Sequence, residues 1–107
     1  MLTYGVEKVI LVIGKSNIMD FPFVEEKIDE NTVIRVFSEL TDSHELVWHR
    51  DREDRIIQSI EPSNWKFQFD NQLPIDLNRT IFIPKETYHR LIKGSGELKI
   101  LIKKLNN

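Results

Sequence analysis

The chain has 107 residues, of which 40% are hydrophobic and 30% charged, and its formal net charge is −2. This length fits one domain, and the small net charge provides no basic field for a phosphate backbone, so we expect no nucleic-acid partner. No apolar run is long enough to span a bilayer, and the absence of cysteine excludes disulfides and thiolate chemistry. Any metal must therefore be held by His, Asp or Glu.

The first apolar segment, residues 6–13, is rich in β-branched side chains and is followed by turn-forming residues at 14–17. This pattern predicts a strand. The segment is short and lacks the small-residue cleavage site of a secretory signal, so we expect a cytoplasmic protein. Residues 18–31 are ambiguous, because the near-helical spacing of their apolar side chains competes with Pro22. They are predicted to form a surface loop or one short helix.

Further strands are predicted where β-branched and aromatic residues alternate with polar ones, or form short apolar runs between turn residues. The pattern places Trp65, Phe67 and Phe69 on one buried face. Many short strands without internal repeats or linkers predict a single all-β domain, a sandwich or a barrel. The segments concerned are 32–40, 44–51, 55–60, 65–69, 75–77, 80–83, 90–92 and 98–105.

Residues 46–55 contain the most informative side chains. His49 and Asp51 are two positions apart, so on a strand both point to the same face, where they could share one cation. His44 is five positions before His49 and is predicted to lie on the opposite face, outside any site. Glu53 would be a further ligand if the strand continued, but its charged neighbours favour a solvated turn.

A resemblance to the cupin superfamily covers roughly residues 43–103. The second cupin motif is written G(x)5PxGxxH; here Pro84 and His89 match it, while Asn78 and Glu86 replace the two glycines. In the first motif, HxH(x)3-4E, His49 and Asp51 take the HxH positions, so aspartate replaces the second histidine. The glutamate position of this motif falls at Arg55 or Ile56. The fold implied is a cupin-like antiparallel β-barrel of the double-stranded β-helix or jelly-roll type, with residues 1–42 as an N-terminal strand extension.

The resemblance implies a barrel pocket with a metal site formed by His49, Asp51 and His89. Two histidines and one carboxylate suit a divalent ion such as Fe, Mn, Ni or Zn. The pocket is also predicted to include Arg55, Tyr88 and Gln68. The implied function is a metal-dependent enzyme of the dioxygenase or isomerase type that acts on a small polar substrate.

Several alternatives remain open. Asp51 could pair with Arg55 while the histidines form hydrogen bonds inside the barrel, which would require no cofactor. Residues 85–93 could form a helix that ends at Gly94, with His89 at the surface, although the motif spacing favours a strand. The function could instead be the binding of a small anion or sugar acid without catalysis, or that of a bacterial or phage assembly protein with a vestigial pocket.

The oligomeric state is predicted from the apolar segment 6–13, which lies outside the cupin-like region. A strand of this kind needs a partner sheet in its own chain or in a second copy. We therefore expect a homodimer.

Overall fold

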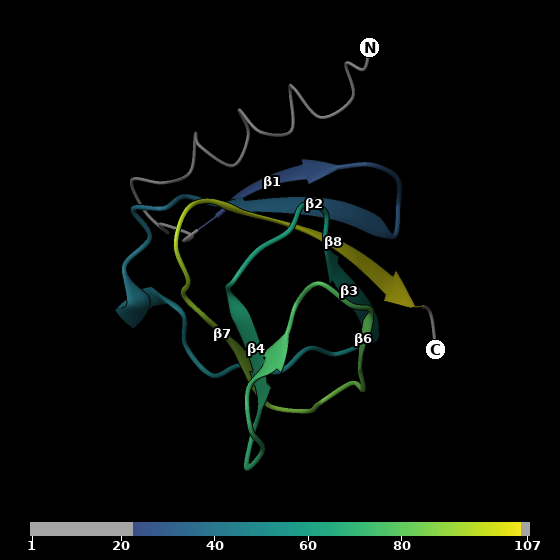
Figure 1. Ribbon diagram of the computed structural model, residues 1–107. Coiled ribbons are helices and arrows are strands. Elements are labelled where there is room, and N and C mark those ends of the chain that lie inside the picture. Colours follow the sequence, from purple (N-terminus) through teal and green to yellow (C-terminus); the bar gives the residue numbers. More distant parts are fainter. Residues whose placement is uncertain (1–22, 106–107) are drawn as a thin grey trace.

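The computed structural model describes residues 23–105, which form two antiparallel β-sheets that enclose the core (Figure 1). The smaller sheet has the strand order β5-β4-β7, with β5 at Ile75–Asp76, β4 at Lys66–Phe69 and β7 at His89–Ile92. The larger sheet has the order β1-β2-β8-β3-β6, with β1 at Val24–Lys27, β2 at Thr32–Phe37, β8 at Leu98–Leu105, β3 at Asp54–Ser59 and β6 at Ile81–Ile83. Within residues 23–105 the helical structure amounts to one 3-10 turn, η1 (Ser43–Glu45). The all-β prediction is confirmed.

The hydrophobic core lies between the sheets and follows the period-two alternation of their strands. On β8, Leu98, Ile100 and Ile102 are buried, whereas Leu101 points outward and is 39% exposed. Their register aligns Ile102 with Ile57 of β3 and with a buried valine of β2. Side chains that alternate in this way bury one face of a sheet and leave the other to solvent.

Trp65 joins the two sheets. Its ring is fully buried, its centroid lies 5.8 Å from that of Phe37, and its indole Nε1 donates a hydrogen bond to the Gly96 carbonyl at 3.1 Å. Gly94 passes so close to this region that a Cβ would lie 2.6 Å from the Trp65 backbone nitrogen. The predicted aromatic face is confirmed for Trp65 and Phe67, while Phe69 is partly buried against the same core.

Most of the predicted strands are present with small shifts of their ends. The strand prediction for 44–51 is wrong as a continuous strand, because η1 occupies its start and only His49 makes a β-bridge. Residues 18–31 were predicted as a loop or short helix, yet residues 24–27 form β1, which pairs with β2 along its whole length. The predicted strand at 6–13 lies outside the described residues. The helical alternative for 85–93 is wrong, because β7 begins at the buried His89.

The described part of the predicted N-terminal extension contributes to the main core. β2 is not an edge strand, because it lies between β1 and β8 in the larger sheet. Its side chains Val33 and Phe37 are buried in the same cluster as residues of β8 and β3. Residues 23–42 therefore share one core with residues 43–103.

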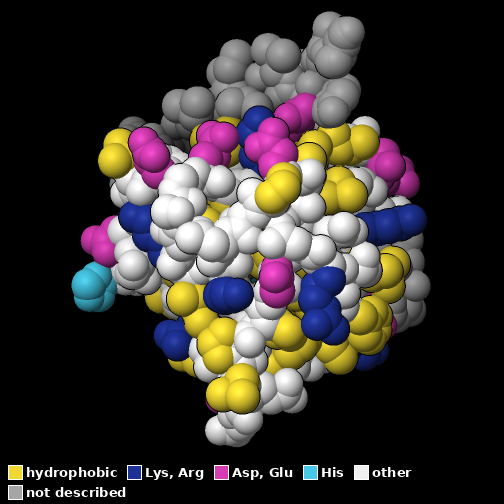
Figure 2. Space-filling view, in the orientation of Figure 1, with side chains coloured by type: hydrophobic (Ala, Val, Ile, Leu, Met, Phe, Trp, Pro, Cys, Tyr) yellow, Lys and Arg dark blue, Asp and Glu magenta, His cyan; other side chains and the backbone are white. Residues whose placement is uncertain are grey.

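The face displayed in Figure 2 has a mixed surface, with Lys and Arg side chains scattered among hydrophobic and polar ones and no continuous basic area. Acidic side chains gather toward the end of this face that carries β1 and β2. Among residues 23–105, no helix has the length and apolar character needed to cross a membrane.

Candidate metal centre

The segment that carries His49 and Asp51 runs antiparallel beside the chain that enters β7. His49 and His89 exchange two backbone hydrogen bonds, at 3.0 and 2.9 Å, and the Glu86 amide donates to the Asp51 carbonyl at 2.7 Å. This pairing extends the smaller sheet by one irregular strand. It brings His49 and Asp51 next to a histidine that is distant in the sequence.

Period-two alternation holds in this segment even though the strand is irregular. His49 and Asp51 both line the cavity between the two sheets, with His49 still exposed to solvent, while Trp48 and Arg50 do not line it. On the outer side, the Arg90 guanidinium lies 4.5 Å from the centre of the Trp48 ring. The two metal-capable side chains are therefore presented to one side, as the two-residue spacing predicted.

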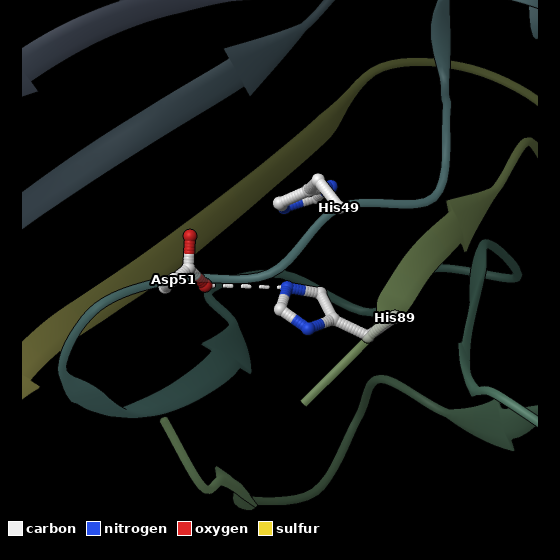
Figure 3. Close-up of side chains that lie close together, drawn as sticks. All are labelled: His49, Asp51 and His89. Atoms are coloured by element: carbon white, nitrogen blue, oxygen red, sulfur yellow. Dashed lines mark ion pairs between the residues drawn. The ribbon is translucent and has the colours of Figure 1, made fainter. Parts of the chain in front are cut away.

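Each of the three residues His49, Asp51 and His89 offers one ligand atom, and these atoms lie within 4.8 Å of one another. Figure 3 shows the three side chains converging, with an ion pair of 3.3 Å between His89 Nε2 and Asp51 Oδ2. The two imidazole rings have centroids 4.3 Å apart and meet edge to face. Ligands of one ion with bonds of about 2.0–2.2 Å lie about 3–4 Å apart, so the cluster needs to contract only slightly around a metal.

Hydrogen bonds to the backbone determine which nitrogen of each histidine is available. Nδ1 of His49 lies 3.1 Å from the Val47 carbonyl, and Nδ1 of His89 lies 2.8 Å from the Thr87 carbonyl. Because a carbonyl oxygen only accepts, each Nδ1 carries a proton and each Nε2 of a neutral ring has a free lone pair. Metal-binding histidines are commonly oriented by such a bond from the second ring nitrogen.

One oxygen of the Asp51 carboxylate lacks the hydrogen bond that its burial requires. Among the side-chain nitrogen and oxygen atoms of residues 23–105, Asp51 Oδ2 is the one that is buried and has no hydrogen bond. His89 Nε2 lies 3.3 Å from this oxygen, and two lone pairs at that distance repel unless a proton or a metal cation lies between them. The donor set therefore fits a cation, and a divalent metal satisfies all three ligands at once.

The electrostatic environment favours the ionisation states that a metal needs. Burial raises the pKa of Asp51, but the neighbouring His89 and Arg55 outweigh it and hold the pKa of this carboxyl below its usual range. Partial desolvation lowers the pKa of His49, which remains exposed on one side, and the charges of His89 and Arg35 add to this effect, whereas the Val47 carbonyl and the Asp51 carboxylate oppose it. Near neutral pH, Asp51 is thus a carboxylate and His49 a neutral imidazole, the forms that bind metal.

Arg55 lies beside the three ligands. It projects from β3, its Nη1 is 3.4 Å from Asp51 Oδ1, and its Nε donates to Glu53 Oε2 at 2.6 Å. The predicted pair between Asp51 and Arg55 is therefore present together with the histidine cluster. Glu53 is a partner of Arg55 and is not among the clustered ligands.

The cluster opens into a cavity of about 390 Å³ between the two sheets. Of the residues predicted for the pocket, Arg55 lines this cavity, whereas Tyr88 and Gln68 do not. Tyr88 immediately precedes His89 and points to the outer side, 45% exposed and near Arg50. Gln68 alternates with Phe67 on β4 and bonds to Arg90 on the outer side. Both side chains have the wrong parity for the cavity.

Residues outside the predicted pocket also line the cavity. Arg35 lies on the same face of β2 as the buried Val33 and Phe37, so the period-two pattern could have placed it inside. Phe23 and Glu45 lie outside any regular alternation, and no sequence signal would have found them. His44 is exposed beside Asp42, outside the site as predicted.

No family model and no curated protein matches the sequence. Solved structures do match the fold. An RmlC-like cupin with a double-stranded β-helix fold from Methanocaldococcus jannaschii aligns at a TM-score of 0.56 and 12% identity, with 77% of each chain covered. The chain has the cupin fold.

Two larger solved structures also align with this fold. The structure of FeII HppE aligns at a TM-score of 0.57 and 11% identity, covering 78% of this chain and 50% of that chain. A structure of DMSP lyases aligns at 0.57 and 14% identity, covering 70% of this chain and 37% of that chain. The present chain thus spans half or less of the length of these two proteins, and the likeness concerns the fold.

The departures from the cupin motifs have visible structural consequences. Glu86, at the second glycine position, has a φ of 60°, the left-handed region that glycine favours, and its amide bonds to Asp51 in this conformation. Asn78, at the first glycine position, instead joins two loops, because its side chain makes hydrogen bonds of 2.9 and 2.8 Å to the Ser63 backbone. Arg55 places a cation where the motif has a carboxylate.

Proposed function

We propose that this cupin-fold protein binds a divalent metal ion through His49, Asp51 and His89. The observation that carries the proposal is the buried Asp51 Oδ2, which has no hydrogen bond in the described chain and lies 3.3 Å from His89 Nε2. The hydrogen bonds that orient both imidazole rings support it.

The proposed activity is that of a metal-dependent enzyme on a small molecule held in the cavity. Three protein ligands leave coordination positions open, and the 390 Å³ cavity is large enough for a small substrate next to them. A bound Fe, Mn, Ni or Zn ion would supply Lewis acidity or, for the redox-active metals, oxygen binding. The protein's own side chains would position the substrate and exclude water. The name of FeII HppE agrees with iron in a neighbouring cupin fold.

A second candidate is the binding of a small anion without catalysis. Arg35 and Arg55 both line the cavity, and guanidinium groups bind carboxylates through paired hydrogen bonds. A protein of this kind would bind its ligand with the same affinity before and after metal removal.

Metal content separates the two candidates. Untagged protein is purified without chelator, its metals are measured by mass spectrometry, and metal-free protein is titrated with Mn²⁺, Fe²⁺ and Zn²⁺ by calorimetry. We expect one ion per chain, and we expect His49→Ala, Asp51→Asn and His89→Ala each to remove it. His44→Ala is the matched control, because His44 is an exposed histidine beside a carboxylate. Equal binding by all four variants would show that the metal proposal is wrong.

A further inference from the structure

The cavity has an unequal distribution of polar groups. Besides the three proposed ligands, its polar lining side chains are Arg35, Arg55 and Glu45. Every other lining side chain is hydrophobic, and several belong to the buried core, among them Phe37 and Ile57. A ligand that fills this space therefore contacts mainly hydrocarbon and meets charge at few points.

The two arginines differ in their remaining hydrogen-bonding capacity. Arg55 bonds through Nε to Glu53 and through Nη1 to Asp51, so two carboxylates compensate its charge. Arg35 bonds through Nε to Glu25 at 2.7 Å, and no partner for its terminal nitrogens is seen within residues 23–105. These terminal nitrogens are not buried orphans, so solvent or a ligand can reach them.

The Arg35 side chain is held in a fixed position. Its guanidinium carbon lies 4.3 Å from the centre of the Phe23 ring, and the Glu25 bond fixes Nε. A guanidinium fixed in this way loses little conformational freedom on binding an anion and can bind a carboxylate with two parallel hydrogen bonds.

The charge of the cavity wall favours an anion once the metal is bound. The two arginines balance Asp51 and Glu45, and a divalent ion at the cluster would make the lining net positive. One negative charge on the ligand would reduce this excess.

We propose that the ligand is a monocarboxylate with an apolar body, whose carboxylate binds Arg35 while the body fills the hydrophobic part of the cavity. The inference rests on the proposed function in taking this cavity as the functional site, and its charge argument also uses the proposed metal ion. It makes the expectation of a small polar substrate more specific, because the polar part of the ligand is a single carboxylate and the rest is hydrocarbon. A sugar acid fits poorly, because its hydroxyl groups would be buried against hydrocarbon without hydrogen-bond partners.

The test compares three probes by calorimetric titration of the zinc-loaded protein. Octanoate combines a carboxylate with an apolar chain, octan-1-ol lacks the charge, and gluconate replaces the apolar chain with hydroxyl groups. We expect octanoate to bind most tightly and gluconate to bind weakest.

Variants of Arg35 locate the carboxylate. We expect Arg35→Gln to weaken octanoate binding by about tenfold or more, since it removes a charge-assisted bidentate contact, and to leave octan-1-ol affinity and zinc content unchanged. Arg35→Lys keeps the positive charge but removes the planar guanidinium, so we expect an octanoate affinity between those of the parent and Arg35→Gln. If Arg35→Gln does not fold, Arg35→Lys takes its place in the test. Arg90→Gln is the matched control, because Arg90 also stacks on an aromatic ring but lies outside the cavity.

The outcomes separate this inference from the metal proposal. Zinc bound at the cluster together with gluconate binding as tight as octanoate would overturn the inference and leave the metal proposal standing. Octanoate affinity that depends on zinc but not on Arg35 would place the carboxylate on the metal and would also overturn it. Octanoate binding that requires Arg35 in a protein that binds no metal would support the inference and contradict the metal proposal.

Discussion

Replacing Arg55 tests how its charge limits the metal site. Arg55 Nη1 lies 3.4 Å from Asp51 Oδ1, so an ion bound to Asp51 would lie near a guanidinium. We expect Arg55→Glu to tighten the binding of Mn²⁺ or Fe²⁺, because it removes a like charge and adds a carboxylate at the position where the cupin motif has one. His49→Ala in the same background should abolish the gain.

The size of the effect follows from the geometry. An ion about 2 Å from the carboxylate would be about 5 Å from the guanidinium, and at an effective dielectric constant of about 20 the repulsion is about 3 kcal/mol per unit of ion charge. Glu53, hydrogen-bonded to Arg55, cancels much of this repulsion. A residual of about 1.4 kcal/mol corresponds to a tenfold change in the dissociation constant, which we take as the minimum expected.

The assay is calorimetric titration of metal-free parent and variants. Arg55→Met separates loss of charge from gain of a ligand, and Arg79→Glu, at an exposed position, is the control for net charge. The reasoning is refuted if the parent binds the ion as tightly as Arg55→Glu does, or if Arg79→Glu tightens binding to the same extent.

Three further predictions concern pH, backbone strain and assembly. The pKa of Asp51 is lowered in the folded protein, so the ionised carboxylate stabilises the fold. This contribution to stability is complete above about pH 4 and is lost as the pH falls through the folded-state pKa. Urea unfolding of metal-free protein should show this loss in the parent and not in Asp51→Asn. Glu86→Gly should raise the free energy of unfolding by up to about 1 kcal/mol, because glycine adopts a φ of 60° without strain. The exposed ion pair between Glu86 and Arg50, which this change removes, contributes little to stability. A lower urea midpoint for the variant would contradict the prediction. The apolar segment 6–13 predicts a homodimer, which light scattering checks: a stable monomer at high concentration would mean that the segment folds onto its own chain.

The sequence was sufficient to predict strands and side-chain faces wherever the local alternation of apolar and polar residues determines the structure. The bounds of β8 were predicted to the residue, because apolar and polar side chains alternate along it between clear turn residues. The shared face of His49 and Asp51 also follows from spacing alone, and it persists although regular strand structure does not extend through this segment. Parity is a property of any extended chain, so it needs no knowledge of the partner strand.

Tertiary structure decided which neighbours these residues have. β1 contains two adjacent glutamates and is a strand because it pairs with β2. His89 joins His49 through a bridge between distant segments, and Arg35 reaches the cavity because β2 lies in the interior of the larger sheet, packed beside β8. Long-range pairing depends on how whole sheets bury their apolar faces, and local sequence does not encode that choice. The alternation of the chain thus determined which side chains face inward, and the packing of the two sheets determined that they form one site.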